Sequence, residues 1–173
     1  MVLSLTPAPT ACLTGSCSWV ENVLYRFIGI NDARGGTITA FDQAGNLYGI
    51  SNYGGAHGYG AVFELTPSAG GWTESSLYSF TGFSDGAYPG SLLVGVDGNL
   101  YGSAGRVPGG GGYGYGVAFQ LVPSASGWAY QVIHTFTEAE SYGFGNLVQD
   151  SSGNLYGTAH TRAIHARLHI SRS

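Results

Sequence analysis

Short runs of alternating apolar and polar residues follow one another along this chain, separated by residues that form turns. In residues 61–65 (AVFEL) and 117–121 (VAFQL), Phe and Leu alternate with Glu or Gln, the pattern of a strand with one side facing water. No segment has the apolar spacing of an amphipathic helix. The pattern therefore predicts an all-β protein built from short antiparallel strands.

A tandem repeat organises these strands. The motif GNLYG begins at Gly45, Gly98 and Gly153, and a tryptophan opens the similar runs WVENVLYRF, WTESSLYSF and WAYQVIHTF. A third motif, GAVFELTP at 60–67, returns as GVAFQLVP at 116–123, and VLSLTP at 2–7 is related to both. Three motifs at one period indicate a true repeat. We expect structural roles for the recurring residues Trp19, Trp72, Trp128, Gly45, Asn46, Tyr48, Gly98, Asn99, Tyr101, Gly153, Asn154 and Tyr156.

Each repeat contains four strand-length runs, of which the tryptophan run comes first. Asp97-Gly98 lies between two of the runs and predicts a two-residue type I′ hairpin turn. Leu77 and Tyr78 are adjacent, which suggests a strand packed on both faces. The expected fold is all-β, a β-propeller-like array of about three four-stranded antiparallel sheets. A β-sandwich or a solenoid-like stack is the alternative.

The repeat divides the chain into a repeat domain and a tail. Residues 1–158 form the domain, with an orphan strand at 2–7 and repeats at 19–71, 72–127 and 128–158. Residues 159–173 do not follow the pattern, and we expect a disordered or out-of-frame segment there. Because three sheets would leave strand edges open, we expect the chain to be part of a longer array or to assemble with other copies.

Composition excludes several classes of protein. With 43% hydrophobic residues the chain can bury a core, and no apolar run is long enough to span a bilayer. Only six cationic residues are present against ten acidic ones, so nucleic acid is not an expected partner. The first residues do not have the pattern of a signal peptide.

The segment DQAGNLYG, together with YGGAHGYGAVFELTPSAGGWTESSLYSFTGFSDGAYP, resembles the Gloeo/Verruco-type tandem repeat, or GloVer repeat. The resemblance covers residues 2–158 and implies a propeller-like repeat region of a large exported bacterial protein. Members often carry an export signal and a surface anchor, neither of which is visible here. The resemblance therefore implies an extracellular or cell-surface location, and it carries over no catalytic residue.

Cys12 and Cys17 lie in an insertion before Trp19. A pair this close in a chain with no other cysteine favours a small disulfide formed in an oxidising compartment. Free thiols or half of a zinc site are the alternatives, and the zinc site would need two more ligands.

The residues that often carry chemistry have structural explanations here. His57 aligns with Tyr113 and His134 aligns with Tyr25 and Tyr78, so these positions require a flat ring with a polar tip. The tail histidines could share a face or a metal, but they lie outside the repeat: His160, His165 and His169. Four aspartates lie in turn sequences, with a weak calcium loop as the alternative: Asp85 and Asp97 directly precede a glycine, and Asp42 and Asp150 precede the GNLYG motif. The run Gly109–Gly112 is not a phosphate loop, and no catalytic residue, metal site or cofactor is expected.

The tyrosines that alternate with glycine in loops are the candidate ligand-binding residues: Tyr59, Tyr113 and Tyr115. Packing between sheets is the alternative role for them. The first functional hypothesis is a non-enzymatic structural or recognition module, with further repeats of the same parent chain or self-association as candidate contacts. The second is a propeller-based glycan-active enzyme or carbohydrate-binding module. An active site would place unusual polar residues in one repeat, and the sequence has no such group, which favours the first hypothesis.

Overall fold

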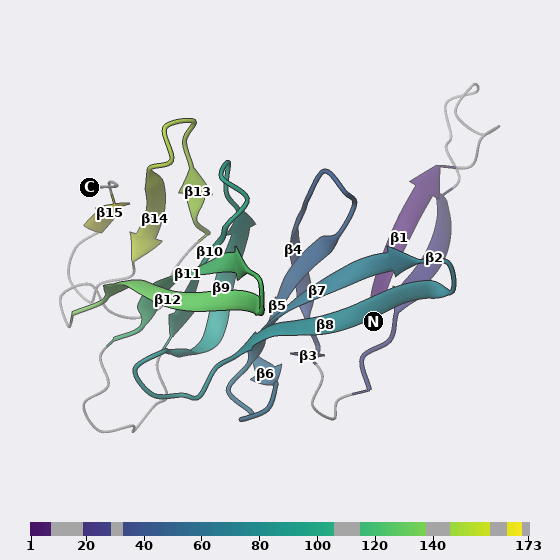
Figure 1. Cartoon of the computed structure of the whole chain (residues 1–173), viewed down its shortest axis with the longest axis horizontal. Helices are drawn as coiled ribbons and strands as arrows, with labels where there is room; N and C mark the ends of the chain where they lie inside the picture. Colours follow the sequence, from purple (N-terminus) through teal and green to yellow (C-terminus); the bar gives the residue numbers. More distant parts are fainter. Residues whose placement is uncertain (8–18, 29–32, 106–114, 138–145, 160–165, 171–173) are drawn as a thin grey trace.

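The chain folds into consecutive antiparallel sheets (Figure 1). The computed structural model describes residues 1–7, 19–28, 33–105, 115–137, 146–159 and 166–170. The first complete sheet has the order β4 (Thr37–Phe41), β5 (Leu47–Ser51), β7 (Ala61–Ser68) and β8 (Gly71–Ser79). The second has the order β9 (Ala87–Val94), β10 (Leu100–Gly105), β11 (Val117–Ser124) and β12 (Gly127–Thr135). Each is an antiparallel meander whose strands follow one another in sequence, except that β6 (Tyr53–Gly54) comes between β5 and β7 and pairs elsewhere.

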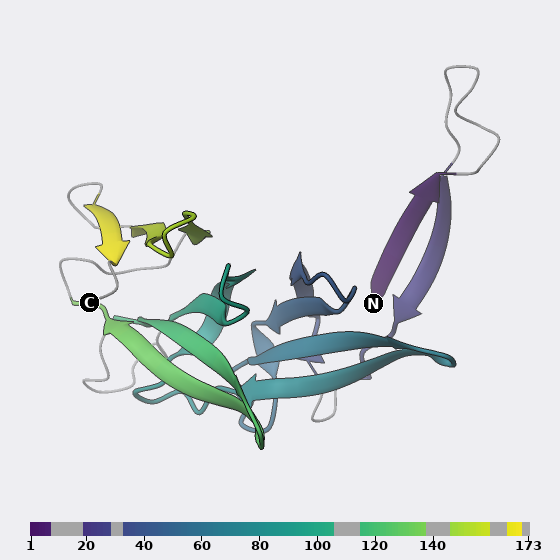
Figure 2. The same ribbon diagram turned by 45° about the horizontal axis from the view of Figure 1, so that its top comes forward.

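Smaller sheets flank these two. The strands β1 (Val2–Pro7) and β2 (Trp19–Tyr25) form one, and β13 (Val148–Gln149), β14 (Leu155–Ala159) and β15 (Ala166–Ile170) form another. The short pair β3 (Ala33–Arg34) and β6 (Tyr53–Gly54) lies beside the first complete sheet. In Figure 2 the sheets follow an open arc whose two ends are β1–β2 and β13–β15. The prediction of an all-β, propeller-like array of four-stranded antiparallel sheets is confirmed.

The sheets are shifted by one strand from the repeat boundaries drawn on the sequence. Each tryptophan run is the last strand of a sheet, because β8 and β12 pair with the preceding strands β7 and β11. Residues 2–7 are not an orphan strand, since β1 pairs with β2 from Val2 to Pro7. In the tail, the backbone of 166–170 forms β15 and pairs with β14. The turns at 68–71 and 124–127 are tight, whereas the connections before and after each of these hairpins are longer. The tight turns therefore favour pairing of the two strands that they join, β7 with β8 and β11 with β12.

The adjacent apolar residues of the tryptophan strands result from a β-bulge. Tyr78 pairs with Val62 while Ser76 pairs with Phe63, so Leu77 is an extra residue between them. The same shift occurs at Leu24 in β2 and at Ile133 in β12. The prediction from Leu77 and Tyr78 of a strand packed on both faces is therefore replaced by an irregularity that repeats in each of the three tryptophan strands.

The turn at Asp97-Gly98 differs from the predicted type I′ hairpin. The Gly95 N–H donates to the carbonyl of Asn99, and the Gly98 N–H donates to the carbonyl of Gly95. Gly98 has a positive φ and Asp97 does not, whereas a type I′ turn needs positive values at both central residues. The chain instead makes a three-residue loop closed by a left-handed glycine, and residues 42–46 and 150–154 make the same loop.

The last glycine of GNLYG leaves space for the side chain of a neighbouring strand. A Cβ built on Gly49 would collide with the ring of Phe63 and lie 2.6 Å from the carbonyl oxygen of Thr37. A Cβ on Gly102 would meet the ring of Phe119 in the same way. Both phenylalanines are fully buried, so the motif and the core depend on each other.

The two complete sheets join through aromatic rings. Tyr78 of β8 stacks on Tyr130 of β12, with ring centroids 3.9 Å apart and planes 11° from parallel. Phe80 lies edge-on to both Tyr130 and Phe119. Trp128 contacts Tyr48 of the first sheet edge-on, with centroids 6.2 Å apart. These contacts fix the two sheets as one body.

The sheet β1–β2 is less covered than its counterparts. Leu3 and Leu5 are 40% and 56% exposed, whereas the corresponding Phe63 and Leu65 are fully buried. Within the described residues β1 pairs with β2 alone, and no strand covers its other edge. Among those residues there is also no helix long and apolar enough to cross a bilayer.

Candidate functional site

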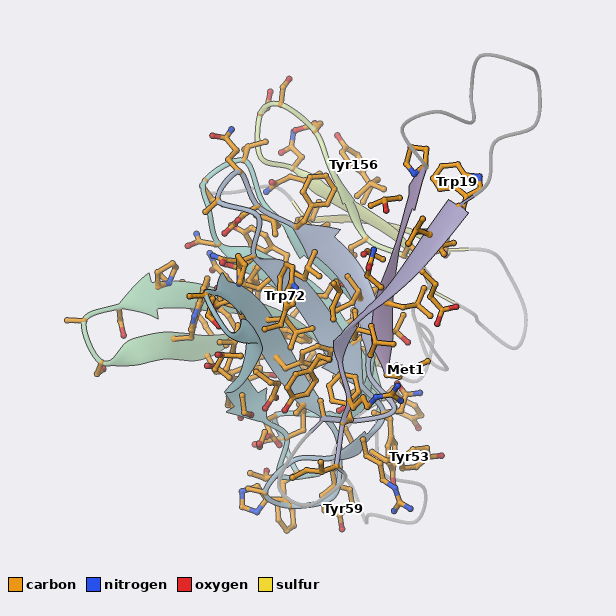
Figure 3. The ribbon with its side chains drawn as sticks, turned by 90° about the vertical axis from the view of Figure 1, so that its right-hand side faces the viewer. Met1, Trp19, Tyr53, Tyr59, Trp72 and Tyr156 are labelled. Atoms are coloured by element: carbon orange, nitrogen blue, oxygen red, sulfur yellow. The ribbon has the colours of Figure 1, made fainter. Side chains whose placement is uncertain are left out.

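The candidate functional side chains, mainly aspartates, asparagines and tyrosines, lie at two opposite edges of the sheets. The loops 42–46, 95–99 and 150–154 form the turn edge, at the top of Figure 1. The connections that follow β5 and β8 form the loop edge. Figure 3 shows Tyr156 near the turn edge, and Tyr53 and Tyr59 at the opposite end of the molecule.

Each turn is held by a group that we call the clasp: an aspartate with the asparagine and the tyrosine of GNLYG. In the first complete sheet the Asp42 carboxylate accepts from the Asn46 backbone N–H at 2.9 Å and from its side-chain amide at 3.0 Å. The hydroxyl of Tyr48 donates to the same carboxylate at 3.1 Å. The left-handed Gly45 completes the turn, so each polar residue of the motif has a structural partner.

The second clasp draws its aspartate from a different position. Asp97 lies two residues before Asn99, rather than four, yet it accepts from Asn99 and from the Tyr101 hydroxyl, the latter at 2.8 Å. Gly95 occupies the position of Asp42, and a Cβ there would lie 2.6 Å from Asp97 Oδ1. With its aspartate at position 97 instead of 95, the second loop therefore keeps the hydrogen bonds to the asparagine and the tyrosine of GNLYG.

The third clasp has the most exposed tyrosine, Tyr156. Asp150 accepts from Asn154 and from the Tyr156 hydroxyl, each at 2.9 Å. The side-chain hydrogen bond from Asn154 is the main cause that lowers the pKa of Asp150 to about 2. At Asp42, burial acts to raise the pKa, but hydrogen bonds from Asn46 and Tyr48 together hold it below its ordinary value. Burial and a neighbouring carboxylate at Glu64 raise the pKa of Tyr48, so its hydroxyl remains a donor.

We expect these clasps to make stability depend on acid. A carboxyl whose pKa is lower in the folded chain stabilises the fold above its unfolded pKa, ordinarily 3.8, and the stabilisation is lost as the pH falls through the folded value. The denaturant midpoint should therefore decrease between about pH 5 and pH 2. Asp150→Asn should make this decrease shallower, as urea unfolding at several pH values would reveal. An unchanged slope would contradict the role of Asp150.

At the loop edge, Asp85 accepts hydrogen bonds in a way similar to the clasps. Its carboxylate accepts from the Tyr78 hydroxyl and the Thr81 N–H at 2.8 Å, and from the Thr81 hydroxyl at 2.6 Å. Burial acts to raise the pKa of Asp85, but these bonds hold it below its ordinary value. The Tyr130 hydroxyl donates to the Asp85 backbone carbonyl at 2.6 Å. Asp85 thus connects the two stacked tyrosines to one loop.

The histidine at 134 lies where the aligned tyrosines lie. Tyr25, Tyr78 and His134 occupy the same place beside the bulge. Each ring lies edge-on to the phenylalanine two residues later, with centroids 5.3, 5.1 and 4.7 Å apart. His57 is exposed in the loop between β6 and β7. Among the described residues no group of three His, Cys, Asp or Glu could hold a metal ion.

Tyr59 belongs to a cluster that we call the tyrosine face: Tyr53, Tyr59 and Tyr88. The ring of Tyr88 lies 5.8 Å from that of Tyr53 and 6.2 Å from that of Tyr59. The Tyr88 N–H donates to the Tyr59 carbonyl at 2.8 Å, and the Tyr59 ring packs on Gly82. Tyr53 is 62% exposed, and the other two are half-buried. The cluster therefore contains two half-buried rings, Tyr59 and Tyr88, and one ring that is exposed to solvent, Tyr53.

The other predicted residues are distributed differently. Tyr115 is half-buried at the start of the segment that leads into β11. Trp72 and Trp128 are half-buried, whereas Trp19 is 59% exposed at the end of β2 (Figure 3). His169 belongs to β15, where its backbone pairs with Tyr156. Outside the described residues lie Cys12, Cys17, Gly109–Gly112, Tyr113, His160 and His165.

The family model of the Gloeobacter/Verrucomicrobia repeat matches residues 14–166 of this chain. The chain belongs to this repeat family. The resemblance drawn from GNLYG and its companion motifs is thus confirmed. In this member of the Gloeobacter/Verrucomicrobia repeat family, GNLYG supplies the asparagine and tyrosine of each clasp, and its last glycine leaves the space for the buried phenylalanine in the two complete sheets.

One solved structure similar to this repeat protein is that of a protein provisionally assigned as a gluconolactonase. The two chains are 21% identical and superpose with a TM-score of 0.49. The similarity covers 75% of this chain and 42% of the other, so this chain spans less than half the length of that structure. No curated protein matches the sequence.

Comparison of motifs alone missed Tyr53, Tyr88 and Gln149. All three stand where the repeats differ: Tyr53 aligns with Arg106, Tyr88 with Arg34, and Gln149 with Phe41 and Val94. A search for positions that break the repeat would have found them.

Proposed function

We propose that this chain is a non-enzymatic recognition module that binds carbohydrate through the tyrosine face. The observation that carries the proposal is the cluster of three tyrosines on one loop edge, with the ring of Tyr53 largely open to solvent. A tyrosine ring offers a flat apolar face together with a polar tip, which suits the face and hydroxyls of a sugar.

The backbone at this cluster supports the proposal. Tyr88 has a φ of 50°, and it is the one non-glycine residue with a positive φ among the described residues. Strained conformations of this kind concentrate at binding sites. The aspartates that the structure describes are engaged in turns and loops, as the clasps and Asp85 show. An extracellular location is part of the proposal and rests on Cys12 and Cys17, since a disulfide needs an oxidising compartment.

We expect Tyr53→Ala to weaken oligosaccharide binding about tenfold, because it removes the open ring while leaving Tyr59 and Tyr88 packed. An oligosaccharide array would select the probe, and calorimetric titration of that probe would measure the change. Trp19→Ala is the matched control, since Trp19 is a comparably exposed aromatic on another sheet.

Equal losses in both variants, or no binding by the unaltered chain, would contradict the proposal. Release of reducing sugar by the chain would favour the glycan-cleaving alternative instead.

A further inference from the structure

A groove lies at the turn edge, away from the tyrosine face. It is independent of the function proposed for the tyrosine face. This turn groove separates the loop of the first complete sheet from the loop of the second and has a volume of about 480 Å³. Phe41 and Val96 stand at its rim with 76% and 70% of their surfaces exposed. Its lining residues are Phe41, Asp42, Gln43, Ala44, Val94, Gly95, Val96 and Gly98.

The corresponding gap between the second and third sheets is bridged by a side-chain amide. Gln149 Oε1 accepts from the backbone N–H of Val96 at 2.8 Å. Its Nε2 donates to the backbone carbonyl of Gly153 at 3.2 Å. One primary carboxamide therefore joins the N–H of one loop to the carbonyl of the next.

The turn groove has the same backbone groups without the amide. Val94 stands at the position of Gln149, because each residue pairs with the leucine of the following GNLYG. Gln43 corresponds to Val96 in the preceding loop, and Gly98 corresponds to Gly153. No hydrogen bond joins the Gln43 N–H or the Gly98 carbonyl to another residue that the structure describes. The Val94 side chain has no polar atom that could bond to either group, and Gln43 and Gly98 both line the open turn groove.

We propose that the turn groove binds a primary carboxamide, the group carried by glutamine and asparagine side chains. The amide oxygen accepts from the Gln43 N–H, and the amide nitrogen donates to the Gly98 carbonyl, as Gln149 does in the next gap. Asp42 also lines the groove, so a carboxylate ligand of the same size would be repelled by the charge of Asp42 and by the carbonyl oxygen of Gly98. Val94 and the exposed Phe41 provide apolar contact for the aliphatic part of the ligand.

The test uses the full chain, isotope-labelled, with backbone amide resonances as the readout. Propionamide should shift the Gln43 resonance saturably, and propionate of the same shape should not. Gln149→Val, which places in the second gap the residue that stands in the turn groove, should open that gap, so that propionamide then shifts the Val96 resonance as well. An absent response to propionamide, or an equal response to propionate, would overturn the proposal.

An internal ligand supplies a second test. Val94→Gln should place an amide in the groove, slow hydrogen exchange at Gln43 at least tenfold and abolish the response to propionamide. Val94→Leu is the control, since it fills the hollow without an amide and should leave exchange at Gln43 fast. A response to propionamide that persists in folded Val94→Gln would contradict the assignment.

Free glutamine and a glutamine residue within a blocked peptide distinguish the two sources of the carboxamide. Tighter binding of the free amino acid identifies a small metabolite as the ligand, and tighter binding of the peptide identifies a protein segment. Failure of both, with propionamide inactive, overturns the site while leaving the tyrosine face untouched.

Discussion

Gly102→Ala should destabilise the fold by about 3 kcal/mol, the cost of forcing an extra carbon into a filled core. The new Cβ would collide with the ring of Phe119 and lie 2.6 Å from the carbonyl oxygen of Ser91 in the adjacent strand β9. The ring cannot move away easily, because Phe119 is fully buried and packs edge-on against Phe80. Urea unfolding followed by tyrosine and tryptophan fluorescence would measure the loss.

Gly70→Ala is the matched control for this substitution. No atom lies within 4 Å of the position that its Cβ would take, and its φ is not positive. The change should therefore stay within about 0.5 kcal/mol. If Gly102→Ala unfolded at the same urea concentration as Gly70→Ala, the packing role assigned to the last glycine of GNLYG would be wrong.

The second large effect is expected at Asp85. Asp85→Ala removes the acceptor of the Tyr78 hydroxyl, of both Thr81 donors and of the Phe83 N–H. Leaving such partly buried donors unpaired should cost about 3 kcal/mol. Thermal unfolding would measure it, with Ser84→Ala, an exposed neighbour, as the control.

A double-mutant cycle with Tyr78→Phe separates the hydrogen bond from general damage to the loop. Because the two side chains share a bond, the combined loss should be smaller than the sum of the two single losses. Additive losses would show that Asp85 acts on the loop alone, without supporting the tyrosine stack.

Much of the fold could be predicted from the sequence because the strands of each complete sheet come from one short stretch of the chain. The alternation in AVFEL and VAFQL corresponds to strands β7 and β11, whose Phe and Leu are buried while Glu64 and Gln120 are not. The prediction that one side of each strand faces water was right only at Glu64 and Gln120, because Val62 and Ala118 on the same side are fully buried. Tandem motifs also predicted the number of strands in each complete sheet, although the tryptophan run was placed first and is in fact the last strand. The assignment of strands to sheets was wrong, because a repeat has no natural first residue and only pairing defines where a sheet begins.

The candidate sites were harder to predict. Tyr59 was found because it alternates with glycine, but its partner Tyr88 comes from the start of the next sheet. The turn groove depends on Val94 being shorter than Gln149, a comparison that has meaning only after Val96 and Gly153 are known to be the partners of the amide. Sequence patterns describe one sheet at a time, and both sites lie between elements.

The meander order of the sheets has a consequence for how the chain folds. Successive strands of each complete sheet pair with one another, with only the short β6 between β5 and β7, so the chain closes only short loops before each pairing forms. Contacts between sheets join neighbours, as in other proteins made of stacked repeats. Assembly can therefore begin in either complete sheet and spread outward. The thinly covered β1–β2 hairpin would then be the last part to order and the first to open.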